Sequence, residues 1–400
     1  MVLRKTMELI DLLACAYLAS QGKTQIEIAR ELGLSQATVS RLLRDAREDD
    51  YLSVKVFFHE EKIESDLLAK VMQRVFNREI VNSLDEIAER YSGQRGLVLR
   101  VFSSGSKDSS EEGMKTRIQE FSKQAAPFIK DLLMNTASCG ISWGTTLGGV
   151  VTALGKTLAD APHTKNPITV IPLGGEPLGL VPNSFSSSYL AANLGKIMNG
   201  ETAQTPSIAM VPAFIPGDFN GTELDGVWKM IGLVEAYEQI FDSQHGQSQI
   251  TRKSLASQLE MILTSVGPAE SLFGYIGREL SRSGMKIEEL QKYAYGDICG
   301  VCIPRPGISK EGEEQLHIIA DRWTGVRRKH LEDCANRAAK HKKPGVVVVA
   351  VGKKKAQFVL EIIKQGLVNT LIVDDDLEEH LKKLVKEELS SIRGAAQTLV

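Results

Sequence analysis

The chain has 400 residues, of which 42% are hydrophobic and 24% are charged, and its formal net charge is −2. These values are typical of a soluble globular protein with two or three domains, and they exclude a generally basic nucleic-acid coat. Five scattered cysteines predict a reducing compartment without a disulfide framework. We therefore expect a cytoplasmic protein in which any contact with nucleic acid depends on a local patch.

The first twenty residues begin with two basic side chains ahead of an apolar run, as a signal peptide would. Glu8 and Asp11 interrupt that run, so the pattern favours an amphipathic helix instead. No other stretch approaches the roughly 18 uncharged apolar residues that a membrane-spanning helix needs. We therefore expect no membrane partner.

The next segment, KTQIEIARELGLSQATVSRLLRDAREDDYL from Lys23 to Leu52, carries the signals of two helices joined by a tight turn. Thr24 and Glu27 match a capping box that begins the first helix, and Gly33 ends it. Ser35 is a good N-cap for the second helix. One face of that second helix is apolar, with Val39, Leu42, Leu43 and Ala46 at helical spacing.

The opposite face of the second helix has the residue types that contact DNA. Its short polar first turn suits base edges in the major groove, and its two arginines suit guanine or phosphate. The residues expected to contact DNA are Gln36, Ala37, Thr38, Ser40, Arg41 and Arg44. A solvent-facing helical hairpin would share the caps and the turn. The spacing of the apolar residues, the turn glycine Gly33 and the polar first turn of the second helix together favour a helix-turn-helix instead. The alternating run from Leu52 onward predicts a strand or a small wing.

The remaining chain changes character at about Gly96. Residues 1–58 form the expected DNA-binding domain, 59–95 a helical connector, and 96–400 a domain in which short apolar runs alternate with helical segments. That alternation is typical of a parallel α/β sheet. The expected strands are Leu97–Phe102, Ala137–Ile141, Ile168–Leu173, Ile208–Val211, Ile262–Val266, Ile298–Ile303, Val346–Val351 and Thr370–Val373.

Four of these strands end in small or polar residues just ahead of a helix. Open α/β sheets bind ligands beyond the carboxyl ends of their strands, where N–H groups at helix starts can hold an anion. The four turns are CGISWGTTLGG, IPLGGE, SVGPAE and VVVVAVGKKK. Three lysines at a helix start oppose the helix dipole unless one of them faces an anion. Each turn also has a purely structural explanation, such as a capping threonine or a glycine turn.

The sequence gives little indication of a metal site, a nucleotide cofactor or histidine-dependent catalysis. Cys299 and Cys302 fall in one expected apolar strand, where residues three apart point to opposite faces, so we expect no metal site. No glycine-rich nucleotide loop follows a strand, and no histidine lies near a plausible nucleophile in the sequence. We expect neither a cofactor nor histidine-dependent catalysis.

These segments together resemble the SorC-type bacterial regulators that respond to phosphorylated sugars. The likeness covers most of the chain and includes TQIEIARELGLSQATVSRLLRDARED, GISWGTTL, PLGGE, SVGPAE, GDICGVCI and VVAVGKKKAQFVLEIIKQGLVNTLIVDDDLEEHL in that order. The resemblance implies a helix-turn-helix head joined to a Rossmann-like effector domain, of the glucosamine-phosphate deaminase/ribose-phosphate isomerase/CoA-transferase-like fold. It also implies a sensor that does not turn over the sugar phosphate, a homodimer or homotetramer, and a palindromic double-stranded DNA operator.

The resemblance also assigns the effector contacts. Phosphate contacts fall on Gly144, Thr145, Thr146 and Lys355. Sugar contacts fall on Gly175, Glu176, Glu270 and Asp297, with Gly267 in the same turn as Glu270. This chain departs from the family pattern at Val351 and Gly352, where two glycines are usual, and its segments 214–249 and 310–328 are longer.

Two other functions stay open from the sequence. In the first, Glu176, Glu270 and Asp297 supply acid and base groups to a phosphosugar isomerase or deaminase, but then the helix-turn-helix has no role. In the second, the α/β domain only oligomerises a DNA-binding protein.

Overall fold

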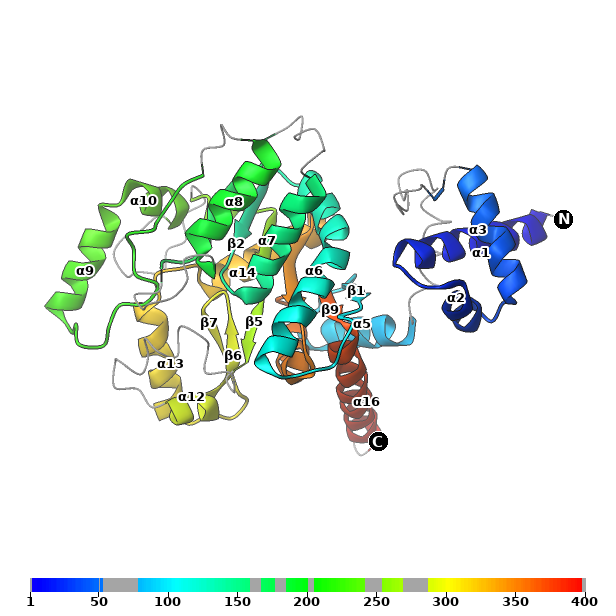
Figure 1. Ribbon diagram of the computed structural model, residues 1–400. Helices are drawn as coiled ribbons and strands as arrows, with labels where there is room; N and C mark the ends of the chain where they lie inside the picture. Colours follow the sequence, from blue (N-terminus) through cyan, green and yellow to red (C-terminus); the bar gives the residue numbers. More distant parts are fainter. Residues whose placement is uncertain are drawn as a thin grey trace. The chain divides into compact units, whose positions relative to one another are not determined.

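The computed structural model describes residues 2–49, 51–52, 78–158, 167–176, 185–200, 205–241, 254–268 and 287–397. The chain divides into two compact units, Met1–Asn82 and Ser83–Val400 (Figure 1). Among the described helices, none combines the length and the apolarity needed to cross a membrane.

The first unit contains the helices α1 (Val2–Ser20), α2 (Gln25–Leu32) and α3 (Gln36–Glu48). The capping box of Thr24 and Glu27 is present at the start of α2, and Gly33 ends that helix in the left-handed conformation with φ 64°. Ser35 accepts a hydrogen bond from the Thr38 N–H at 3.1 Å, at the start of α3. The sequence signals for both helices are thus confirmed.

The three helices share one apolar core. The stripe expected on α3 is buried (Val39, Leu42, Leu43 and Ala46) and packs with Ile28 of α2. α1 contributes more than one stripe, because residues 12–18 are all buried. The expected wing beyond Leu52 and the connector His59–Phe76 lie outside the described residues.

The second unit is built on a six-stranded sheet in which every pairing is parallel, with the order β1-β9-β8-β4-β2-β3. The strands are β1 (Val98–Phe102), β2 (Ser138–Ile141), β3 (Thr169–Pro172), β4 (Met261–Thr264), β8 (Gly345–Ala350) and β9 (Thr370–Asp374). The parallel α/β sheet expected from the sequence is confirmed. Its central strands β4 and β8 are apolar except for Thr264 at the end of β4, because both faces are covered.

Helices cover both faces of this sheet. α6 (Glu111–Met134), α7 (Thr145–Leu158) and α8 (Ser187–Asn199) lie side by side (Figure 1). They share a core with alternate residues of β2, β4 and β8, among them Ile141, Leu263 and Val349. α14 (Arg328–His341), α15 (Ala356–Lys364) and α16 (Asp375–Gln397) complete the layers, and α14 and α16 contact β8 and β9.

A second, antiparallel sheet has the order β5-β6-β7 and consists of β5 (Val266–Pro268), β6 (Ala294–Ile298) and β7 (Val301–Pro304). The single strand expected at Ile298–Ile303 is therefore wrong, because the chain reverses at Cys299 and Gly300, which have φ 53° and 79°. The two cysteines do not share a strand. The remaining described helices are α5 (Arg78–Ser92), α9 (Thr222–Gly232), α10 (Glu235–Phe241), η3 (Ala256–Gln258), α12 (Ile287–Tyr293), α13 (Lys310–Arg322) and η5 (Lys353–Lys355).

The strand expected at Ile208–Val211 is also wrong. This segment forms a turn, and its neighbour Pro212 makes only an isolated bridge to Glu176. The apolar run lies between Pro206 and Pro212, and proline has no N–H to donate to a strand ladder. Ile208 and Val211 are buried, whereas Met210 is 91% exposed, so the apolar run reflects the packing of two side chains and not sheet pairing.

Candidate functional site

The direction in which successive strands are added to the sheet changes at one place, between β2 and β4. The chain passes from β2 to β3 on one side, whereas it passes from β4 to β8 on the other side. Open α/β sheets bind ligands beyond the carboxyl ends of strands at such a switch point. Here the hydroxyl oxygens of Ser142 and Thr264, at the ends of β2 and β4, lie 2.9 Å apart.

The turn after β2 places the first predicted residues at this point. Gly144 has φ 128°, and a Cβ at this position would lie 3.3 Å from the Ser265 hydroxyl, so the backbone comes close to the end of β4. Thr145 and Thr146 begin α7, with Thr145 exposed and Thr146 buried. The first N–H groups of a helix have no partner within it and carry partial positive charge. This turn therefore offers donors to an anion.

The neighbouring strands bring three more predicted residues together. Gly267 pairs with Asp297 between β5 and β6, and a Cβ on Gly267 would lie 2.6 Å from Asp297 Oδ1. The Lys355 ammonium interacts electrostatically with the carboxylates of Asp297 and Asp374. Residues far apart in the chain thus form one charged cluster at the carboxyl edge of the sheet.

Burial shifts the pKa of both charged partners. It raises the pKa of Asp297 to about 7, although the Gly300 N–H at 2.9 Å and the Lys355 charge act in the opposite direction. It lowers the pKa of Lys355 to about 8, although Asp374 and Asp297 oppose this. A bound anion would stabilise the charged form of Lys355 and raise its pKa.

Three residues that we did not predict, Arg117, Asp374 and Asp376, fix the turn of residues 352–355 that carries Lys355. Arg117 of α6 is fully buried, and its Nη2 lies 2.5 Å from Asp374 Oδ2 and 2.9 Å from Asp376 Oδ2. Asp374 Oδ1 accepts a hydrogen bond from the Gly352 N–H at 2.9 Å, and Asp376 Oδ2 accepts one from the Lys353 N–H at 3.3 Å. The position of Lys355 therefore depends on this cluster. An arginine on the apolar stripe of α6 was the available signal in the sequence.

A pair of tryptophans forms another unpredicted feature beside the site. Trp143 directly precedes Gly144, and its ring centre lies 5.0 Å from that of Trp323. Trp323 is 2% exposed and donates from Nε1 to the Val326 carbonyl at 3.0 Å. Glycines allow this packing, since a Cβ at Gly174 would come within 2.8 Å of the Trp323 ring. The two rings pack against each other where the chain enters α7.

The remaining predicted residues lie elsewhere or cannot be placed. Gly175 packs against the backbone of residues 211–212, where a Cβ would lie 2.5 Å from the Val211 carbonyl. Glu176 accepts a hydrogen bond from the Ser188 N–H at 3.1 Å, at the start of α8. Both follow β3, the strand beside β2. Glu270 lies outside the described residues.

No family model matches the chain, and no curated protein matches its sequence significantly. Solved structures do match its fold. The full-length sorbitol operon regulator SorC from Klebsiella pneumoniae aligns with a TM-score of 0.50 and 18% identity, over 94% of this chain and 98% of that one. The fold is that of the SorC-type regulators.

Two further structures agree with this result. A DeoR family transcriptional regulator from Listeria monocytogenes has a TM-score of 0.50 and 19% identity, over 75% of this chain and 99% of that one. A proposed sugar-binding domain of a Vibrio fischeri transcriptional repressor has a TM-score of 0.50 and 14% identity, over 78% of this chain and 100% of that one. The resemblance to SorC-type regulators expected from the sequence is thus confirmed at the level of the fold.

The first unit of this SorC-type fold presents the predicted DNA-contacting residues on α3. Gln36, Ala37, Ser40, Arg41 and Arg44 are exposed, opposite the buried stripe of the helix. Thr38 is half-buried, and its hydroxyl lies 2.8 Å from that of Ser35.

Both arginines on this face lie near the same carboxylate. Arg41 Nη1 is 3.6 Å from Asp45 Oδ2, and Arg44 Nε is 3.6 Å from Asp45 Oδ1. Exposed ion pairs of this kind contribute about 0–1 kcal/mol, so the guanidinium groups can exchange Asp45 for phosphate at little cost.

Proposed function

We propose that the chain is a DNA-binding transcriptional regulator whose operator affinity is modulated by a phosphorylated sugar or a related metabolite. The observation that carries the proposal is the charged cluster of Lys355, Asp297 and Asp374 at the carboxyl edge of the sheet, where burial lowers the pKa of Lys355 to about 8. A half-buried lysine at the start of a helix, as Lys355 is for α15, is an arrangement that can bind an anion.

In this proposal the phosphate group binds between the start of α7 and Lys355. Gly144 lets the backbone approach, the N–H groups and hydroxyls of Thr145 and Thr146 donate hydrogen bonds, and Lys355 supplies the charge. Charge-assisted hydrogen bonds of this kind are shorter and stronger than neutral ones.

The sugar hydroxyls would meet the carboxylates around the phosphate site. Asp297, with Gly267 beside it, is close enough to Lys355 to serve this role. We assign the remaining sugar contacts to Gly175, Glu176 and Glu270. Of these, Glu176 already accepts a hydrogen bond from the Ser188 N–H at the start of α8. A ligand bound to its other carboxylate oxygen would therefore be linked to that helix through Glu176.

The exposed face of α3 would enter the major groove of a DNA operator. Its polar first turn would face base edges, and Arg41 and Arg44 would contact guanine or phosphate. Two such heads in a homodimer or homotetramer would bind a palindrome, with half-sites one helical turn, about 34 Å, or a multiple of it apart. The effector shifts operator binding by preferring one of two protein arrangements.

The shifted pKa values of Asp297 and Lys355 support a second candidate function, that of an enzyme. The pKa of Asp297 is about 7 and that of Lys355 about 8, and such values suit a general acid and base near neutral pH. This pair would serve a phosphosugar isomerase or deaminase. The SorC-type fold and the exposed polar face of α3 favour the regulator.

A thermal-shift screen of phosphorylated sugars tests the proposal, because a ligand that binds only the native state raises its melting temperature. The regulator account predicts a stabilising sugar phosphate that is recovered unchanged after incubation, and no stabilisation of Lys355→Ala. Steady product formation would favour the enzyme. Equal stabilisation of both proteins would refute the assignment of the site.

A further inference from the structure

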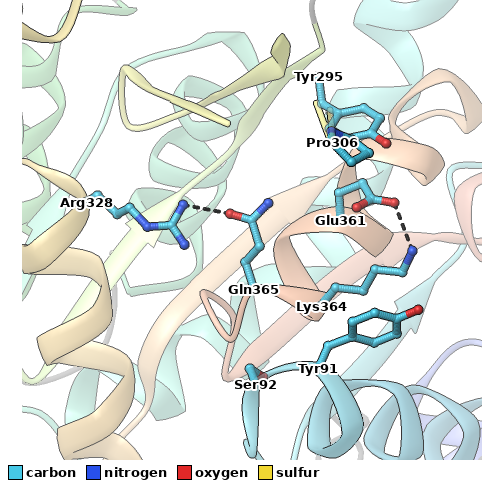
Figure 2. Close-up of a pocket in the computed structure, with 8 residues that line it drawn as sticks. All are labelled: Tyr91, Ser92, Tyr295, Pro306, Arg328, Glu361, Lys364 and Gln365. Atoms are coloured by element: carbon cyan, nitrogen blue, oxygen red, sulfur yellow. Dashed lines mark hydrogen bonds and ion pairs between the residues drawn. The ribbon is translucent and has the colours of Figure 1, made fainter. Parts of the chain in front are cut away.

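A cavity of about 640 Å³ lies at the last turn of α15, at the far end of that helix from Lys355. Lys364 lines it, and at 1.5 Å per residue the two lysines are about 13 Å apart along the helix. Figure 2 shows Arg328 and Gln365 meeting on one side, with Glu361, Lys364 and two tyrosines around the rest. None of the residues assigned to the sugar phosphate lines this cavity.

The charged groups of the cavity are already paired within the protein. Lys364 Nζ lies 3.1 Å from Glu361 Oε1 and 2.7 Å from Glu388 Oε2. Arg328 Nε donates to Glu332 Oε1 at 2.8 Å. The Arg305 guanidinium lies 4.6 Å from the centre of the Tyr295 ring, so three cations meet three carboxylates and the cavity has no excess positive charge for a phosphate. This balance separates it from the site at Lys355.

Several hydrogen-bonding groups in the cavity remain available. Arg328 Nη1 donates to Gln365 Oε1 at 2.7 Å. This hydrogen bond fixes the orientation of the Gln365 amide, so that its nitrogen is held as a donor. Within the part of the chain that the structure describes, neither this nitrogen nor the Tyr295 hydroxyl has an intramolecular partner. The second oxygen of Glu361 is an acceptor nearby. The rings of Tyr91 and Tyr295 and the side chain of Pro306 add apolar walls.

We propose that this cavity is a second ligand site, which binds a small uncharged polyol or sugar. Its hydroxyls would accept from Gln365 Nε2 and Tyr295 and donate to Glu361, while the tyrosine rings cover its carbon face. Apolar walls with a few positioned polar groups are typical of small-molecule sites, and 640 Å³ is within the usual range of roughly 300–1,000 Å³. A neutral ligand leaves the paired charges undisturbed.

The same groups hold the last turn of α5. The Tyr91 hydroxyl donates to Glu388 Oε1 at 2.6 Å, and Lys364 Nζ lies 5.1 Å from the centre of the Tyr91 ring. A ligand in the cavity therefore contacts α5, the helix that enters the second unit from the preceding part of the chain. Ligand binding would change how firmly α5 docks on α15 and α16.

Saturation-transfer NMR on the full chain tests this site, with sorbitol, D-glucose and maltose as neutral probes and glucose 6-phosphate as a charged one. We expect transfer to at least one neutral probe. Gln365→Met and Tyr295→Phe, which keep the side-chain volume, should each weaken its binding by up to about tenfold, the effect of one lost hydrogen bond. Melting temperatures establish that both variants fold.

Lys355→Ala is the matched control, because it removes the proposed phosphate contact and leaves this cavity intact. It should bind the neutral probe as the wild type does. Absence of transfer to all three neutral probes would overturn the proposal, as would full binding in both cavity variants. Loss of binding in Lys355→Ala would place the sugar at the other site. None of these results depends on DNA binding.

Discussion

Arg117 and Asp374 form a buried ion pair between α6 and the end of β9, with 2.5 Å between Nη2 and Oδ2. Both side chains are fully buried, and 257 positions separate them in the chain. The other oxygen of Asp374 accepts from the Gly352 N–H, so the pair connects α6 to the turn that carries Lys355.

Replacing Arg117 with Met should therefore damage both stability and effector binding. It removes the guanidinium that pairs with both Asp374 and Asp376 and leaves Lys355 to interact with Asp374, and breaking a buried pair in this way costs about 3–5 kcal/mol. Urea unfolding measures the loss, and Lys123→Met on the exposed face of the same helix is the control. A change of less than about 1 kcal/mol in Arg117→Met would contradict a structural role for the pair.

Removing the Lys355 ammonium should abolish most of the effector response. Hydrogen bonds to charged groups contribute about 1.5–3 kcal/mol, so Lys355→Met should weaken sugar-phosphate binding by at least about tenfold. Calorimetric titration measures the affinity. The neighbouring Lys354 is exposed, and Lys354→Met should bind the effector nearly as well as the wild type. Equal losses in the two variants would indicate general electrostatic attraction instead of a specific contact.

Arg41→Ala should weaken specific DNA binding by about 1–3 kcal/mol if the side chain pairs with guanine. Fluorescence anisotropy with a labelled operator fragment measures the change. Lys123→Ala, which removes an exposed charge from the second unit, controls for net charge. The assignment of Arg41 fails if its loss leaves the affinity unchanged.

Neutralising Asp45 should have the opposite effect on DNA binding. Its carboxylate lies 3.6 Å from both Arg41 and Arg44 and competes with phosphate for them. Asp45→Asn should therefore raise the affinity for DNA, most clearly at low salt, where exposed charges are least screened. Anisotropy at two salt concentrations measures this. A weaker complex at low salt would mean that Asp45 positions the arginines and does not compete for them.

The raised pKa of Asp297 predicts a dependence of stability on pH. Its pKa rises from 3.8 to about 7 on folding, so between these values the folded protein binds more protons than the unfolded chain. Stability should then fall as the pH rises through this window. Asp297→Asn has no titrating carboxyl, and its free energy of unfolding should vary less over the same range. Parallel pH profiles for the two proteins would show that Asp297 does not titrate as described.

Local patterns allowed most of the elements to be predicted. The capping box of Thr24, the turn at Gly33 and the buried stripe of α3 follow from neighbouring residues, and the structure confirms them. The apolar strands of the parallel sheet were predicted for the same reason. The hairpin at Cys299 was missed because its turn lies within an apolar run and has only one glycine to mark it.

The candidate site was only partly predictable. Small residues after strands marked Gly144 and Gly267, and the lysine run marked the turn at Lys355. The support behind them depends on contacts between distant segments, such as Arg117 with Asp374 and Trp143 with Trp323. No local pattern specifies these partners. The cavity beside α15 was missed for the same reason, since five separate segments form it.

The most direct test of the central claim is a selection of genomic DNA fragments by the purified full chain, with and without a pool of phosphorylated sugars. The account predicts that a small set of palindromic fragments is enriched, that the sugar phosphates change this enrichment, and that Lys355→Met retains the enrichment but loses the change. If no fragment is enriched under either condition, the chain does not act as a sequence-specific regulator and the account is contradicted.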